Sequence, residues 1–445
     1  MMQGIWEDRL QKSEPKAAGQ PRIPAARVYE RSEFGYWVMV VFSFLYYFRP
    51  GDIIPGVGVL HPARITAVFA VVALLMGANK IRPKRLPAEI KIIFAMFGWM
   101  VLTIPFAYWR GGSFQQVFFE FSKAVIVTLT LIVTVTRKVE LRRLMLVQAL
   151  GVALMTIAAV LVNNRTQGRL SGVGDALLSN PNDLAINVAL NWPLCLLFLI
   201  TARGMAAKLF WAISMLIMIY ALIQTYSRAG FLALMVALVF CLWEFGIRRK
   251  KLYVLGVAFI CLVGTVAVAP GNYIARLETL VGRFQQGDYD RGSAEARYVL
   301  LIQSLKVTAT HPIFGVGPGN FPSYTGLWRV THNTYTQFSS ECGIPVLLLF
   351  LLLMRRVFLN LRYLRKIPRS ADTDEMHLYA GALTASFGAY LLGAFFSSTG
   401  FELFPYYMVV YTTLLYRLTL MEQERKTTSM VRTAIEVRPR AYTPA

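Results

Sequence analysis

The motifs HPIFGVGPGNF (His311–Phe321) and HNTY (His332–Tyr335) close a polar passage, Pro270–Asn333, that separates two long apolar runs. The passage is rich in arginine and carries Arg276, Arg283, Arg291 and Arg297. Apolar runs of about 18 residues or more are typical of membrane-spanning helices, so a polar passage between two of them predicts a loop outside the bilayer. The fold class therefore follows from how apolar runs and polar loops alternate along the chain.

The composition predicts an all-α, polytopic membrane protein. Of the 445 residues, 56% are hydrophobic and 16% are charged, whereas soluble domains carry about a quarter charged residues. The mean hydropathy is +0.49. We expect about twelve membrane-spanning helices, which are Phe34–Phe48, Ile65–Ala78, Ile90–Trp109, Phe114–Thr136, Leu141–Val162, Leu184–Thr201, Leu209–Tyr226, Gly230–Gly246, Leu252–Ala269, Tyr335–Met354, Leu378–Ser398 and Phe404–Leu420.

The basic residues predict the orientation of these spans. Lys and Arg total 46 against 24 Asp and Glu, which gives a formal net charge of +22. Most of them fall in alternate connections and in the two polar termini, as the positive-inside rule expects of the cytoplasmic side. The charge therefore indicates topology rather than nucleic-acid binding. We expect cytoplasmic tails at 1–33 and 422–445, a membrane domain at 34–421, and external loops at 163–183 and 270–333.

The external loops carry more arginine than the positive-inside rule predicts. Guanidinium groups bind phosphate through two parallel hydrogen bonds and stay charged at any working pH. An anionic ligand such as a lipid diphosphate, bound at the outer membrane face, would account for the excess. The alternative is salt bridging to the carboxylates of the same loop, Glu278, Asp288, Asp290 and Glu295.

Arg228 lies in the motif TYSRAGF (Thr225–Phe231), where two predicted helices meet with almost no connecting loop. A charge held at the membrane interface by helix ends is costly, and such residues are functional by default. Gly230 would permit a tight turn or a close approach of the helices. The alternative is an arginine that snorkels to the lipid headgroups.

His332 is predicted to open a helix, with Thr331 a candidate N-cap. The positive end of a helix dipole disfavours a protonated imidazole, so we expect a neutral His332 that can accept a proton. A purely structural histidine is the alternative.

Two further motifs have simple structural interpretations. Asn182 or Asp183 suits an Asx N-cap before a long apolar helix. Glu120 and Lys123 lie one turn apart within a predicted span, where they should neutralise each other; a proton relay is the alternative.

No cofactor and no metal is expected. The Gly-rich turn Gly315–Gly319 does not join a strand to a helix, so a dinucleotide or P-loop site is a weak interpretation. Asp288 and Asp290 have the spacing with which some glycosyltransferases hold a metal, but they lie in a Gly-rich loop without further ligands.

Four motifs in order resemble the O-antigen ligase and O-antigen polymerase superfamily. They are NPNDLA (Asn180–Ala185), SRAGFLAL (Ser227–Leu234), EAR (Glu295–Arg297) ahead of HPIFGVGPGNF, and HNTYTQFSSECGIPVLLLF (His332–Phe350). The resemblance covers 163–350 closely and the whole chain in topology, and YYFRPGDIIPG (Tyr46–Gly56) resembles members associated with exopolysaccharide and glycosylation loci. Ala229 stands where such members often have glycine, a mild departure.

The resemblance implies a GT-C-like fold in the bacterial cytoplasmic membrane and an inverting, metal-independent glycosyl transfer at the periplasmic face. The donor would be a glycan on polyprenyl diphosphate, usually undecaprenyl diphosphate. The acceptor would be lipid A core in a ligase, a growing glycan in a polymerase, or a protein hydroxyl in an oligosaccharyltransferase. Membrane lipids are the remaining expected partners.

The same resemblance implies three catalytic residues, Arg228, Arg297 and His332. Two arginines can stabilise the charge of a diphosphate leaving group, and a neutral histidine can take the proton of the attacking hydroxyl. We expect substrate contacts from Arg169, Asn182, Asp183, Arg291, Asn333 and Tyr335. The rival of another class is a lipid-linked-glycan transporter, although transporters usually show internal repeats and charges at the bilayer midplane.

Overall fold

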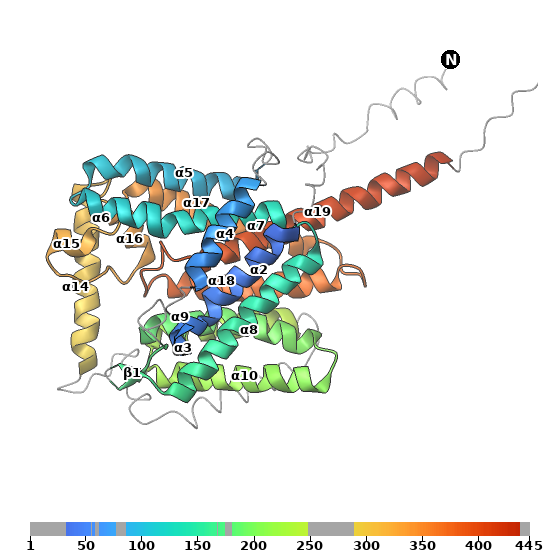
Figure 1. Cartoon of the computed structure of the whole chain (residues 1–445), viewed down its shortest axis with the longest axis horizontal. Coiled ribbons are helices and arrows are strands. Elements are labelled where there is room, and N and C mark those ends of the chain that lie inside the picture. The colour runs from blue at the N-terminus through green and yellow to red at the C-terminus, as the bar shows by residue number, and fades with distance from the viewer. Residues whose placement is uncertain are drawn as a thin grey trace, which may run out of the picture.

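The structure is a computed structural model that describes residues 33–54, 56–57, 62–76, 86–166, 168–173, 180–247 and 289–436. These residues form a helical bundle with one small hairpin, as the composition predicts (Figure 1). The helices are α2 (Glu33–Phe48), α3 (Pro50–Ile53), α4 (Pro62–Met76), α5 (Ala88–Thr103), η4 (Ile104–Phe106), α6 (Arg110–Gln115), η5 (Gln116–Phe121), α7 (Ser122–Thr134), α8 (Lys138–Val162), α9 (Pro181–Thr201), α10 (Met205–Gln224), α11 (Arg228–Cys241), η6 (Leu242–Ile247), α14 (Tyr289–Thr310), α15 (Phe321–Thr325), α16 (Thr334–Glu341), α17 (Ile344–Lys366), α18 (Asp374–Gly393) and α19 (Phe404–Glu436). The strands β1 (Arg165–Thr166) and β2 (Arg169–Leu170) pair antiparallel.

Seven of the described helical stretches are long and apolar enough to cross a membrane. They are Ala88–Phe106, Arg110–Thr134, Lys138–Val162, Pro181–Thr201, Met205–Gln224, Arg228–Gly246 and Ile344–Lys366. Helices α2 and α4, with 16 and 15 residues, are shorter than the roughly 20 that a bilayer requires. The predicted span Leu252–Ala269 lies outside the described residues. The chain is therefore a multi-pass membrane protein, and the count of twelve spans stays a prediction.

Helix α9 lies at the centre of the bundle, where it packs against α8, α10, α11 and α18. Two of its polar residues, Asn187 and Asn191, are hydrogen-bonded to each other inside this core. Asn191 donates to the Asn187 carbonyl oxygen at 2.8 Å and accepts from Gln148 Nε2 at 2.7 Å. Because its neighbours surround it, α9 is a rigid support for the residues at its N-terminus, Asn182 and Asp183.

The predicted span Tyr335–Met354 is wrong at its start. The chain forms the short helix α16 and then, after Cys342 and Gly343, the long helix α17. Gly343 adopts φ +84°, a left-handed conformation that ends α16, and Pro345 suits the first turn of the following helix. The apolar character of the sequence conceals this break.

Helix α14 lies across one end of the bundle, at a large angle to α5, α10 and α17 (Figure 1). It ends at Thr310, directly before His311 and Pro312. Its Leu300 and Val307 form a small core with Val316 and Phe321 of the following turn. We call this region, with the starts of α9, α11 and α16, the α14 end.

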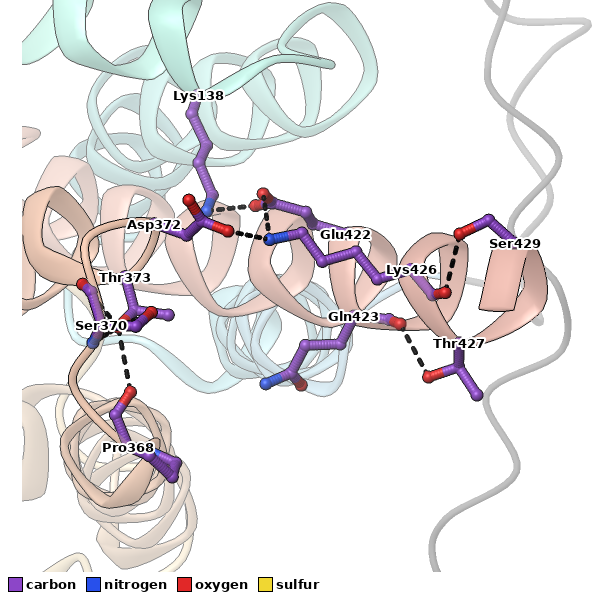
Figure 2. A network of polar contacts seen from close by, with 10 residues as sticks. All are labelled: Lys138, Pro368, Ser370, Asp372, Thr373, Glu422, Gln423, Lys426, Thr427 and Ser429. Atoms are coloured by element: carbon purple, nitrogen blue, oxygen red, sulfur yellow. Dashed lines mark hydrogen bonds and ion pairs between the residues drawn. The ribbon is translucent and has the colours of Figure 1, made fainter. Parts of the chain in front are cut away.

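The opposite end, from which α19 protrudes, is bound together by ion pairs (Figure 1). Lys426 Nζ lies 2.8 Å from Asp372 Oδ2 and 3.8 Å from Glu422 Oε1, and Lys138 pairs with Glu422 (Figure 2). We call this region the α19 end. The helix continues to Glu436, so residue 422, the predicted start of the C-terminal tail, lies within α19.

Candidate functional site

The turn before α11 presents Arg228. Ser227 caps the helix, because its Oγ accepts from the Gly230 N–H at 3.2 Å, and Arg228 is the first helical residue. A Cβ atom on Gly230 would lie 2.3 Å from Ala185 Cβ, so glycine permits a close approach of α11 to α9. The Arg228 side chain is half-buried.

Arg169 and Asn182 connect the hairpin to this turn. The Asn182 Oδ1 atom accepts from Arg169 Nη2 at 2.8 Å and from Ser227 Oγ at 2.9 Å. Arg169 Nε also donates to the Thr225 carbonyl oxygen at 2.7 Å. Three predicted site residues, Arg169, Asn182 and Arg228, therefore lie together, with the first two contacting the turn that carries the third. Their contact with substrate stays a prediction.

The N-cap of α9 is Asn180, whose Oδ1 accepts from the Asn182 backbone N–H at 2.9 Å. The prediction of Asn182 or Asp183 as the cap is therefore wrong. The physical reason is Pro181, which has no N–H and is favoured as the first residue of a helix. The side chains of Asn182 and Asp183 therefore make other contacts: Asn182 with Arg169 and Ser227, and Asp183 with Ser397.

Asp183 connects α9 to α14. One of its oxygens, Oδ1, accepts from Ser397 Oγ at 2.6 Å. The Arg297 guanidinium of α14 lies close enough to interact electrostatically with this carboxylate. This interaction places the charge of Arg297 near the start of α9, where Asn182 contacts the turn that carries Arg228.

His332 lies in the electric field of two arginines. Burial, with the charges of Arg297 and Arg329, lowers the pKa of His332 to about 4. The imidazole is therefore neutral near pH 7 and can accept a proton, as predicted. The cause differs from the prediction, because the N-cap of α16 is Asn333, and His332 precedes it with φ +52°.

Asn333 and Tyr335 have structural contacts of their own. Asn333 Oδ1 accepts from the backbone N–H groups of Tyr335 and Thr336 at 2.9 and 3.1 Å. The Tyr335 hydroxyl donates to the Leu391 carbonyl oxygen at 3.0 Å, and its ring centroid lies 4.5 Å from that of Phe395. These contacts orient the start of α16; a role of either residue in substrate binding stays a prediction.

The Gly-rich turn fastens α14 to α16. Burial raises the pKa of Glu341 to about 8, and this carboxyl group accepts from the Gly319 N–H at 2.9 Å. A Cβ atom on Gly315 would lie 2.4 Å from the Glu341 carbonyl carbon, and one on Gly343 would lie 1.9 Å from the Ile313 carbonyl oxygen. The glycines therefore permit close packing, and the turn holds α14, which carries Arg297, against α16, which His332 precedes.

Glu402 is an ionisable residue of the α14 end that the sequence did not indicate. Burial raises the pKa of Glu402 to about 8, and Asp183 and Glu120 raise it further while Lys123 and Arg49 oppose the shift. Lys123 Nζ lies 2.7 Å from Glu120 Oε2, as the predicted neutralisation requires, with both side chains 51% exposed. Glu402 thus interacts electrostatically both with Asp183 and with Glu120 and Lys123 of the fourth predicted span.

Arg329 and the segment Ser397–Thr399 are further residues that the sequence interpretation missed. Arg329 has no motif around it, and its relevance comes from its charge beside His332. The signal for Ser397–Thr399 was the polar sequence SSTG between two apolar runs, at the predicted external side. Asp288 and the loop arginines before it lie outside the described residues, and nothing is described of the side chains of Asp290 and Arg291.

A comparison with protein families finds a match over part of the chain. Residues 213–351 match the family model described as O-antigen ligase. The matched segment includes Arg228, Arg297 and His332, so the resemblance read from the motifs is confirmed there. A search of curated proteins finds no match. The match supports a bacterial membrane protein with a glycan function of the O-antigen ligase or polymerase type, for which lipid-linked glycan and membrane lipid are the expected partners.

Proposed function

We propose that this protein is a membrane glycosyltransferase that moves a glycan from polyprenyl diphosphate, such as undecaprenyl diphosphate, to a hydroxyl acceptor at the periplasmic face. The observation that carries the proposal is a half-buried His332 whose pKa is lowered by desolvation and by the guanidinium charges of Arg297 and Arg329. A proton acceptor next to fixed positive charge suits a reaction in which a hydroxyl attacks and a diphosphate leaves.

In the proposed reaction, the acceptor oxygen attacks the anomeric carbon from the face opposite the diphosphate. The new C–O bond forms as the bond to the phosphate oxygen breaks, and its electron pair stays on the leaving diphosphate. Arg228 and Arg297 stabilise that charge, and His332 takes the proton of the acceptor hydroxyl. The anomeric configuration is inverted.

Binding of the donor should make His332 a stronger base. Burial and two guanidinium charges hold the pKa of His332 at about 4, which makes free His332 a weak base. A bound diphosphate would offset the charges of Arg297 and Arg329, so the pKa of His332 would rise toward its usual range. His332 would then be a better base when donor is bound than when the site is empty.

The proposal is tested with purified protein, polyprenyl-diphosphate-linked glycan and three acceptors: lipid A core, a free glycan chain and a protein substrate. We expect product with one acceptor, which separates ligase from polymerase and from protein oligosaccharyltransferase. The variants His332→Ala and Arg228→Ala should lose about 100-fold or more in kcat.

Lys426→Gln at the α19 end is the matched control, because it removes a charge far from His332 and should transfer normally. Full activity in His332→Ala or Arg228→Ala would refute the assigned roles. Glycan flux across liposomes without covalent product would instead favour a transporter.

A further inference from the structure

The connection between α18 and α19 is bound to the start of α16 through hydroxyl groups. Its central residues are Ser397, Ser398 and Thr399, which we call the hydroxyl turn. Thr334 Oγ1 donates to the Ser397 carbonyl oxygen at 2.7 Å and accepts from the Thr399 backbone N–H at 3.0 Å. Thr331 Oγ1 lies 2.8 Å from Ser398 Oγ. The turn therefore contacts the chain on both sides of His332.

These contacts surround a strained residue. His332 adopts φ +52°, a left-handed conformation that costs a non-glycine residue about 1 kcal/mol or more. Such a conformation persists only where its surroundings over-determine it. Thr331 and Thr334, both fully buried, supply that restraint, since each is hydrogen-bonded to the hydroxyl turn.

The same turn reaches the carboxylate beside Arg297. Ser397, which is 5% exposed, donates from Oγ to Asp183 Oδ1 at 2.6 Å while its carbonyl oxygen accepts from Thr334. Ser397 thus joins the start of α9 to the start of α16 within one residue. Asp183 in turn interacts electrostatically with Arg297.

We propose that the hydroxyl turn is a positioning element of the site, in which Ser398 and Ser397 hold His332 in its left-handed conformation and in register with Asp183 and Arg297. The residues of the turn act through His332, so they are positioning residues rather than catalytic ones. This inference rests on the proposed function, because it assigns the turn to the base of that reaction. Since misplacement of a catalytic group by about 1 Å can cost about 100-fold in rate, the turn should affect kcat more than donor binding.

The test uses Ser397→Ala, Ser398→Ala and Thr331→Val in the full-length protein, with Thr331→Ser to retain the hydroxyl. The first readout is the titration of His332 by NMR in protein labelled with 15N-histidine, assigned through His332→Gln. We expect the pKa of His332 to rise by about one unit or more in the first three variants, because a loosened imidazole gains water. Thr331→Ser should titrate as the wild type does.

The second readout is transfer: we expect kcat to fall tenfold to about 100-fold with the donor KM changed by less than twofold. Ser386→Ala is the matched control, since the Ser386 hydroxyl is buried in α18 and has no hydrogen-bond partner among the described residues. General destabilisation would lower the amount of folded protein without moving the titration. An unchanged His332 titration in Ser397→Ala, Ser398→Ala and Thr331→Val would overturn the inference, whereas inactivity of wild-type protein would refute only the proposed function.

Discussion

Basic side chains have different kinds of partner at the two ends of the bundle. At the α19 end, Lys426 pairs with the carboxylates of Asp372 and Glu422, and Arg356 Nε lies 3.1 Å from the buried Glu89 Oε1. At the α14 end, Arg165 and Arg169 donate to neutral oxygens, although Arg49 Nε on the same side lies 2.9 Å from Asp52 Oδ2. Arg165 bonds to Asn163 Oδ1, to the Gly168 carbonyl oxygen and to Gln224 Oε1, and Arg169 bonds to the Thr225 carbonyl oxygen and Asn182 Oδ1.

The difference has a physical meaning. A carboxylate partner cancels the charge that it orients, whereas an amide or carbonyl oxygen orients a guanidinium and leaves its charge in place. Arg297 interacts with the Asp183 carboxylate, but its charge and that of Arg329 still lower the pKa of His332, so the potential at this residue of the α14 end is positive. This end is suited to bind an anion such as a diphosphate, and the α19 end is suited to hold helices together.

The largest expected effect comes from removing a charge at the α14 end. Arg297→Ala should reduce kcat/KM for transfer by about 100-fold to 1,000-fold, because a fixed positive group facing the leaving diphosphate is lost. Arg297→Lys should recover only part of this, since an ammonium cannot bind phosphate in two parallel bonds. Steady-state transfer assays check both values. Equal activity of Arg297→Ala and wild type would show that the retained charge has no role in the reaction.

The rigid packing of the α14 end is tested through stability. Gly343→Ala should lower the free energy of unfolding by at least about 2 kcal/mol. Its Cβ atom would meet the Ile313 carbonyl oxygen, and alanine disfavours φ +84°. The thermal midpoint in detergent measures this loss.

Gly98→Ala in α5 is the matched control for Gly343→Ala, because its Cβ atom would meet nothing within 4 Å. Alanine is also the better helix former, so this control should be as stable as wild type or slightly more stable. A Gly343→Ala protein as stable as Gly98→Ala would contradict the packing of the Gly-rich turn on α16.

The pH dependence of transfer tests whether the pKa of His332 is lowered by its surroundings. The pKa of His332 is lowered from 6.5 to about 4, so the base is neutral above that pH and becomes protonated below it. We expect kcat/KM, which reports the free enzyme, to be flat from pH 7 to about 5 and to fall about tenfold per pH unit below 4. In Arg329→Gln the fall should begin at higher pH. A fall centred at pH 6.5 in the wild type would mean that His332 is exposed to solvent.

The smallest effect is expected at the α19 end. The hydrogen bond from Lys426 lowers the pKa of Asp372, but both groups are fully exposed, and such pairs contribute little to stability. Asp372→Asn should leave transfer unchanged and the thermal midpoint nearly so, in assays run beside Arg297→Ala. A loss of transfer comparable to that of Arg297→Ala would remove the distinction between the two ends.

The sequence predicted the bundle well and its interruptions less well. Apolar length predicts helices such as α8 and α9, since a bilayer requires roughly 20 apolar residues. It could not predict the break at Cys342–Gly343, because the apolar pattern continues across it and only the positive φ of Gly343 ends the helix.

The candidate site was predictable where local motifs exist. Arg228, Arg297 and His332 stand in recognisable motifs, and all three lie in the segment that matches the family. Ser397 was not predictable, because its partner Asp183 is 214 residues away and a hydrogen bond at that separation leaves no local pattern. The same holds for Arg329, whose effect on His332 acts through space.

The most direct test of the account measures donor binding at the α14 end. Purified protein in nanodiscs is titrated with polyprenyl diphosphate, and wild type is compared with Arg297→Gln and with Lys426→Gln. We predict that Arg297→Gln binds at least about tenfold more weakly, the equivalent of about 1.4 kcal/mol, while Lys426→Gln binds as wild type does. Equal affinity of Arg297→Gln and wild type for the diphosphate would contradict the account.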